Sequence, residues 1–239
     1  MNVMPSPSNA ATASPVALAA AILAAAHTLL PRLERGQSFD TAFLRGAMEA
    51  AFLASDATGA WDWKDAYEAV EVATVLFLQK FGRVLFRKAS SPEARLAALE
   101  KIAALLPTHT RRSEESRALQ QFSTPIPLGL AAITAAAIGP GDVVLEPSAG
   151  TGLPAVLAEI AGGRLLLNEL AETRAALLAS LFPSARVTRF DAAQIDDHLG
   201  TDAVPTVVVM NPPFSALAHV TGRVADAGLR HVASALARL

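Results

Sequence analysis

The chain has 239 residues, of which 52% are hydrophobic and 18% charged, and it contains no cysteine. Such a composition is globular and excludes a disordered tail or a disulfide-stapled secreted module, and the length allows one large domain or two modest ones. The 20 basic and 22 acidic residues give a net charge of −2, which excludes a polycationic coat for nucleic acid but permits a local basic face.

No segment has the pattern of a targeting device. The longest apolar run, residues 16–30, is shorter than the about 20 residues that span a bilayer. No lysine or arginine precedes Arg32, whereas a signal peptide begins with a basic region. We therefore expect a buried, alanine-rich helix in a soluble, cytoplasmic protein with no membrane partner, and the absence of cysteine agrees with a reducing compartment.

The first half is predicted to be helical. Residues 1–13 are a Pro/Ser-rich lead that should fray, and residues 14–112 should form a helical domain. Trp61 and Trp63 are interpreted as packing anchors rather than a ligand platform. Helices are expected over residues 14–34, 38–54 or 40–54, 62–88 and 91–107. The third has apolar residues at three-and-four spacing, namely Tyr67, Val70, Thr74, Phe77, Phe81 and Val84.

The second half alternates short β-branched runs with helical segments, which is typical of a parallel, doubly wound α/β sheet. Such sheets bind ligands at the carboxyl ends of their strands, so the loops there are the candidate sites. Strands are expected over residues 143–145, 165–167, 186–188 and 206–210. Helices are expected over residues 153–161, 171–181, 193–198 and 222–239.

The first three strand ends carry residues with two interpretations each. The small residues of the loop 146–152 would let the backbone approach a ligand, or would only connect strand to helix. Glu169 lies 19 positions beyond Gly150 (169 − 150), where such sheets place an acid for ribose hydroxyls, but it could equally favour the next helix dipole. Asp191 could accept a hydrogen bond from an exocyclic amine or act as an ordinary helix cap.

The fourth strand end reads Asn211-Pro212-Pro213-Phe214. Two prolines stiffen the backbone and remove two amide donors, whereas a simple turn would more often use Gly or Asp. They fix an amide, two carbonyls and an aromatic ring at the ligand edge of the sheet. This array suits the binding of a planar amine.

These motifs resemble those of the S-adenosylmethionine-dependent amino-methyltransferases, especially the N6-adenine DNA methyltransferases. The resemblance covers residues 113–239 and includes Gln121-Phe122-Ser123-Thr124-Pro125, which resembles the segment that closes over the methionine end of the cofactor. The run from Arg111 to Pro125, with the helical first half, also resembles the amino-terminal region of bacterial proteins that fuse a methylase to a strawberry-notch-like helicase.

The resemblance implies a Rossmann-like class I methyltransferase sheet that uses S-adenosylmethionine and no metal. The catalytic residues would be Asn211, Pro212, Pro213 and Phe214, with the first two accepting the amine hydrogens and the ring stacking on a flipped base. The cofactor would contact Phe122, Ser123, Thr124, Pro125, Glu146, Pro147, Ser148, Ala149, Gly150, Thr151, Gly152, Glu169, Asp191 and Asn211. Glu146 would lie near its ammonium.

The sequence departs from the family in its length, because residues up to 239 supply only four of its strands. We therefore expect a sheet incomplete at its C-terminus, in a fragment or amino-terminal part of a longer protein that includes a helicase region. Its exposed strand edge could mediate oligomerisation. The basic clusters Arg83-Arg87-Lys88 and Arg111-Arg112-Arg117 are interpreted as solvated helix faces.

The leading functional hypothesis is methylation of the N6 amine of adenine in DNA. Similar enzymes with the Asn-Pro-Pro-aromatic motif act on ribosomal RNA bases or on a protein glutamine, so these substrates stay open. A different hypothesis is a non-catalytic cofactor- or DNA-binding module of a helicase fusion, although an inactive scaffold has no need of Asn211, Pro212 and Phe214. The helical domain could be a lid, a docking surface or a recognition element.

Overall fold

A computed structural model describes residues 14–107, 123–212 and 227–239, so the predicted lead and the predicted domain boundary at residue 113 lie outside it. The first range is helical, as predicted. Its elements are α1 (Pro15–Glu34), α2 (Thr41–Phe52), the short 3₁₀ helix η1 (Asp56–Thr58), α3 (Trp63–Lys88) and α4 (Pro92–Ala103). The helix starts follow the predicted caps, since Ser14, Asp40 and Ser91 each accept a backbone N–H through their side chains.

The central helix of this half is α3. A capping box starts it: the Asp62 side chain accepts the Asp65 N–H, and the Asp65 side chain accepts the Asp62 N–H. Tyr67, Val70 and Thr74 of the predicted apolar face are buried, but Val84 is 42% exposed. The residues between them are buried as well, because α1 packs on one side of α3 and α7 on another. The part of α3 from Asp65 to Val75 is buried on all sides and therefore has no single apolar stripe to predict.

The second half alternates strands and helices, as predicted. Its elements are α6 (Ile126–Ala135), β1 (Val143–Glu146), α7 (Leu153–Ala161), β2 (Arg164–Asn168), α8 (Glu172–Leu181), β3 (Arg186–Thr188), η2 (Ala192–Gln194), α9 (Ile195–His198), β4 (Val207–Val208) and α10 (Ala227–Leu236). Of the last predicted helix, residues 222–239, the part up to 226 lies outside the described residues.

The four described strands form one parallel sheet in the order β3-β2-β1-β4. This is an α/β fold compatible with a Rossmann-like architecture. From β1 the chain adds β2 and β3 on one side, and it then returns to add β4 on the other side of β1. The boundary between β1 and β4 is therefore the switch point at which such sheets bind ligands. The β4 ladder is shorter than the predicted strand, yet the amides of Thr206 and Val209 still donate to β1 carbonyls at 2.8 and 3.0 Å.

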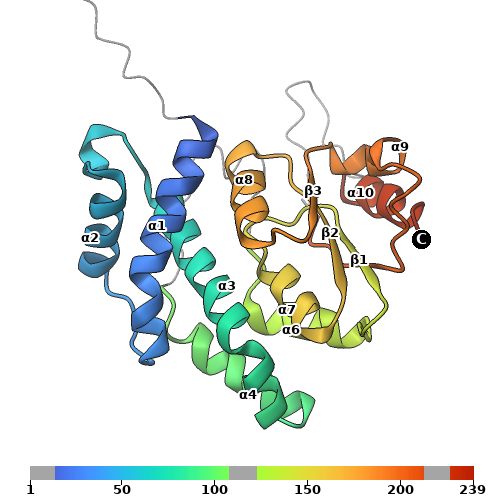
Figure 1. The fold of residues 1–239 in the computed structure, drawn as a ribbon, viewed down its shortest axis with the longest axis horizontal. Coiled ribbons are helices and arrows are strands. Elements are labelled where there is room, and N and C mark those ends of the chain that lie inside the picture. The colour runs from blue at the N-terminus through green and yellow to red at the C-terminus, as the bar shows by residue number, and fades with distance from the viewer. Residues whose placement is uncertain (1–13, 108–122, 213–226) are drawn as a thin grey trace, which may run out of the picture.

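The helical half and the sheet share a continuous hydrophobic core. Figure 1 shows α7 and α8 between the sheet and the helical half, while α9 and α10 lie on the other side of the sheet. Helix α3 packs on α7 and α1 packs on α8. A second, smaller cluster joins Leu145 of β1 to Ile195, Leu199, Ala203 and Ala235. The strand-end loops are therefore held between two packed layers.

Helix α1 corresponds to the predicted buried, alanine-rich helix. By length and apolar composition it is the one described helix that could cross a bilayer, and it is longer than the apolar run within it. Ile22, Ala25, Ala26 and Leu29 have no exposed surface in the fold and belong to the shared core. This face of α1 is thus packed against protein.

Candidate functional site

A small cleft lies where the strand-end loops meet. Its volume is about 30 Å³. Eight of the residues predicted to bind the cofactor line it, namely Ser123, Thr124, Glu146, Ser148, Ala149, Gly150, Thr151 and Asn211. The segment before α6, the loop after β1 and the end of β4 thus come together. Phe122, Pro213 and Phe214 lie outside the described residues.

The loop after β1 contains two glycines in left-handed backbone conformations, with φ of 57° at Gly150 and 90° at Gly152. A Cβ at Gly152 would come within 2.5 Å of the Phe182 ring, so α8 packs where a side chain would be. A Cβ at Gly150 would meet nothing nearer than an Arg174 nitrogen at 3.9 Å. Gly152 is therefore required by packing, whereas Gly150 leaves space beside the cleft.

Glu169 joins the end of β2 to this loop. One carboxylate oxygen accepts the Gly150 N–H and the other accepts the Ala171 N–H at the start of α8, both at 2.9 Å. The predicted spacing thus brings Glu169 to the glycine loop, and the side chain also has the helix-start role of the alternative interpretation. Glu169 is buried and does not line the cleft.

The residue before it, Asn168, was not singled out by the sequence analysis. Its Nδ2 donates to the carbonyls of Pro147 and Phe190, and its Oδ1 accepts the Phe190 N–H and the Thr188 hydroxyl, all at 2.8–2.9 Å. A single buried amide therefore fastens together the ends of β1, β2 and β3.

Asp191 lies at the end of the third strand segment. Its side chain is exposed and accepts the Ala193 N–H at 2.9 Å, which caps η2. The capping interpretation describes this contact, and a role in binding an exocyclic amine stays a prediction. Two further predicted residues do not line the cleft: Pro125 precedes α6, and Pro147 supplies the carbonyl that Asn168 binds.

Asn211 and Pro212 follow β4 after two intervening residues, Val209 and Met210. The Asn211 Nδ2 donates to the Thr124 hydroxyl at 3.1 Å, so the donor end of the amide is held against the segment before α6. This orientation leaves Oδ1 as the end of the amide that can accept. The Asn-Pro-Pro motif and the Ser-Thr-Pro motif, 87 residues apart in sequence for this contact, are therefore in direct contact.

Glu146 is the most unusual titratable residue of the cleft. Its side chain is 3% exposed, and no hydrogen-bond donor among the described residues contacts its carboxylate. Burial, with a smaller contribution from the nearby Glu169 carboxylate, raises the pKa of Glu146 well above its usual 4.5. A buried, unpaired carboxyl facing a cleft is poised to accept a cation.

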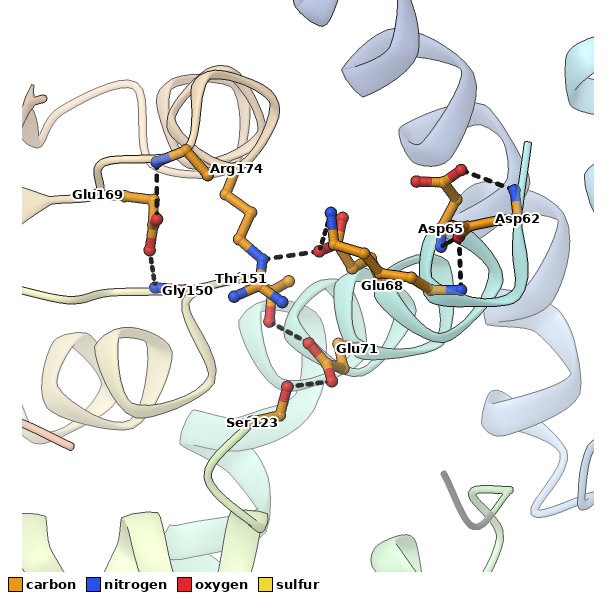
Figure 2. A network of polar contacts seen from close by, with 11 residues as sticks. Asp62, Asp65, Glu68, Glu71, Ser123, Gly150, Thr151, Glu169 and Arg174 are labelled. Atoms are coloured by element: carbon orange, nitrogen blue, oxygen red, sulfur yellow. Dashed lines mark hydrogen bonds and ion pairs between the residues drawn. The ribbon is translucent and has the colours of Figure 1, made fainter. Parts of the chain in front are cut away.

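A buried polar network of the helical half extends into the site (Figure 2). Glu71 of α3 accepts the hydroxyl of Thr151 at 2.7 Å through one oxygen and the hydroxyl of Ser123 through the other. Glu68, one turn earlier, pairs with Nε of Arg174 at 2.7 Å. Sequence reasoning missed both acids. For Glu71 the signal was available, because it is the one charged residue in the run 69–78 and has no basic residue three or four positions away.

Among the described residues around the cleft, buried acidic side chains outnumber buried basic ones. Glu68, Glu71, Glu146 and Glu169 are each at most 8% exposed, whereas Arg174 is the one buried basic side chain in the described part of this network. Burial lowers the pKa of Arg174, but the carboxylates of Glu68, Glu71 and Glu169 outweigh it and the pKa is raised. At the start of α3, burial raises the pKa of Asp65 to about 7. A cationic ligand would stabilise the charged form of these buried acids.

No protein-family model, curated protein or solved structure matches this chain. The family resemblance thus depends on the motifs themselves and on the way in which the fold brings them together.

A larger cavity of about 850 Å³ lies between α3, α4, α6 and α7. Arg83, Arg87 and Arg95 line it above an apolar floor, and Arg83 donates to the Glu159 carbonyl at 3.2 Å. None of the strand-end motifs reaches it, so we place the candidate site at the smaller cleft. In the described ranges no three His, Asp or Glu side chains are grouped to hold a metal.

Proposed function

We propose that this protein is an S-adenosylmethionine-dependent N-methyltransferase whose target is an exocyclic amine, with N6 of adenine in DNA as the leading substrate. The observation that carries the proposal is the position of the motifs. The loop 146–152 and Asn211-Pro212 follow neighbouring strands, β1 and β4, on either side of the switch point.

The charge of the cleft supports this cofactor. S-adenosylmethionine supplies an electrophilic methyl group on a sulfonium and also carries an ammonium. Glu146 would accept the ammonium, because its buried carboxyl has no donor among the described residues. The bare backbone at Gly150 leaves room for close approach. The cleft of about 30 Å³ must widen on binding, since drug-sized ligands occupy pockets of about 300–1,000 Å³.

The geometry at Asn211 supports an amine as the target. Thr124 holds Nδ2, so Oδ1 can accept one hydrogen of the amine while the Pro212 carbonyl accepts the other. Holding both hydrogens directs the nitrogen lone pair away from the acceptors. Positioning of this kind lowers the barrier by fixing the reactants before reaction. Phe214 would stack on the flipped base.

Calorimetric titration with S-adenosylhomocysteine, followed by transfer of a radiolabelled methyl group to DNA, RNA and protein in parallel, tests the proposal. We expect heat of binding and label in DNA. Asn211→Ala should abolish transfer and leave affinity for S-adenosylhomocysteine within about three-fold. Gln194→Ala, an exposed amide away from the cleft, serves as the matched control and should change neither.

The outcomes separate the alternatives. No heat of binding would refute the proposal and support a scaffold role in a helicase-containing polypeptide. Binding without label in any acceptor would support a non-catalytic cofactor module. Label in RNA or protein alone would keep the chemistry and replace the substrate.

A further inference from the structure

One carboxylate from the helical half joins two segments that line the cleft. Glu71 lies on α3 and is 4% exposed. One of its oxygens accepts the hydroxyl of Ser123, 52 residues along the chain, and the other accepts the hydroxyl of Thr151, 80 residues along the chain. Ser123 precedes α6 and Thr151 lies in the loop after β1, so Glu71 fixes the two segments relative to one another (Figure 2).

The contact continues to the proposed target site. Thr124 is adjacent to Ser123, and its hydroxyl accepts a hydrogen bond from Nδ2 of Asn211 at 3.1 Å. Ser123, Thr124, Thr151 and Asn211 all line the cleft. A displacement of the Ser123 hydroxyl would therefore be transmitted to the amide that we propose for amine binding.

Glu71 is suited to this bridging role. A carboxylate has two acceptor oxygens, so it can bind two hydroxyls at once, and burial strengthens hydrogen bonds to a charged group. The neighbouring acid Glu68 instead pairs with Arg174, which leaves the two hydroxyls to Glu71. Glu68 and Glu71 thus contact different parts of the strand-end region.

We propose that Glu71 is a positioning residue of the cofactor site: it sets the separation of the Ser123-Thr124 segment and the Gly150–Gly152 loop, and thereby makes α3 part of the methyltransferase. This inference rests on the proposed function. It gives the helical half a definite role, since binding at the strand ends would depend on a side chain of that half.

Affinity for S-adenosylhomocysteine, measured by calorimetry, tests the inference in three variants. Glu71→Ala removes both acceptors and should weaken binding at least ten-fold. Glu71→Gln keeps one acceptor and adds a donor that either hydroxyl can accept, so its affinity should stay within about three-fold. Glu100→Gln, an exposed acid on α4, is the matched control and should bind like the unmodified protein.

Epistasis distinguishes positioning from direct contact or general destabilisation. If Glu71 acts through the two hydroxyls, then Glu71→Leu should weaken binding in the unmodified chain and cause no further loss in a Ser123→Ala/Thr151→Val background. Leu fills the volume that Ala would leave empty, so this variant serves even where Glu71→Ala does not fold. Thermal unfolding of each variant shows that the protein titrated is folded.

Failure of the inference differs from failure of the proposed function. If the unmodified protein binds no S-adenosylhomocysteine, the proposed function fails and the inference fails with it. If the unmodified protein binds but Glu71→Ala and Glu71→Leu bind equally well, only the positioning role is refuted. A Glu71→Gln variant as weak as Glu71→Ala would also refute positioning and indicate a charge contact with the ligand.

Discussion

Two carboxyls meet at the end of β1, and the fold satisfies them differently. Glu169 accepts two backbone N–H groups, whereas Glu146 is buried beside it with no donor among the described residues. Charge on Glu146 is thus disfavoured in the ligand-free protein and becomes favourable only when a cation arrives. Stability of the ligand-free protein therefore favours a neutral Glu146, whereas binding of a cation favours a charged one.

Glu146→Gln should reveal this conflict through its pH dependence. Because the folded-state pKa of Glu146 lies above the usual 4.5, the folded protein binds more protons between the two values. The free energy of unfolding therefore falls as pH rises through that range. Because Gln does not ionise, the Glu146→Gln variant does not lose stability in this way. At pH 8.5 its free energy of unfolding should exceed that of the unmodified protein by about 1–3 kcal/mol.

Urea denaturation at pH 4.5 and pH 8.5 measures the effect. The stabilities of the variant and the unmodified protein should converge at the lower pH and separate at the higher one. The same variant should lose affinity for S-adenosylhomocysteine. An equal difference at both pH values would contradict the assigned cause, and Glu100→Gln should show no difference at either.

Sequence reasoning found the residues with short-range patterns and missed those whose partners are distant. Asn211, Gly150 and Glu169 belong to motifs with local spacing, and they lie at the same end of the sheet. Glu68 and Glu71 belong to no motif of local spacing. Their partners Arg174 and Thr151 are 106 and 80 residues away, so only the fold brings the pairs together.

At the scale of elements, the connection between β1 and α7 combines an unobstructed position at Gly150 with tight packing at Gly152. Gly152 caps α7 at φ 90° with α8 against its Cα, whereas Gly150 faces open space at φ 57°. The backbone at Gly150 can thus be approached by a ligand, whereas the absence of a side chain at Gly152 is required for the packing of α8 against the loop.

Matched alanine substitutions separate these roles. Gly152→Ala should lower the free energy of unfolding by about 2–4 kcal/mol, because a strained φ adds to a clash with Phe182. Gly150→Ala should lower the free energy of unfolding only by the backbone strain, about 1–2 kcal/mol. Its methyl group would, however, occupy space in the proposed cofactor site and weaken ligand binding. Denaturation and ligand titration of both variants check this. Equal losses of stability would contradict the packing difference between the two positions.

Element boundaries followed cap residues closely where those signals were present. Helix α7 runs from Leu153 to Ala161 as predicted, with glycines at both ends. Helix α6 (Ile126–Ala135) was not predicted, because Pro127 and Gly129 discourage a helix by propensity. Pro127 lies in the first turn, where its missing N–H costs nothing, and Gly129 lies against Leu157 of α7, where a Cβ would be 3.2 Å from Cδ1.

At the scale of the whole molecule, the two halves predicted from composition share one core. Gln79 of α3 donates to the Leu181 carbonyl of α8 at 2.7 Å, and the Glu68–Arg174 pair is buried at the same boundary. Composition correctly separated a helical half from an α/β half. It could not show that they pack together, because that contact depends on residues scattered over both.

We therefore expect the halves to unfold in a single transition. Both tryptophans, Trp61 and Trp63, lie in the helical half, so their fluorescence reports on that half alone. Amide hydrogen exchange in β1 and β2 reports on the sheet. The two probes should give the same midpoint in urea. A sheet that persists after the tryptophan signal is lost would show that the halves are independently stable.

The small volume of the cleft has a consequence for kinetics. A cavity of about 30 Å³ is far smaller than the pockets of about 300–1,000 Å³ that hold drug-sized ligands. A ligand of the proposed size can therefore enter only after the cleft has widened. The observed rate of association should then level off at high ligand concentration, at a ceiling set by the opening of the protein rather than by diffusion.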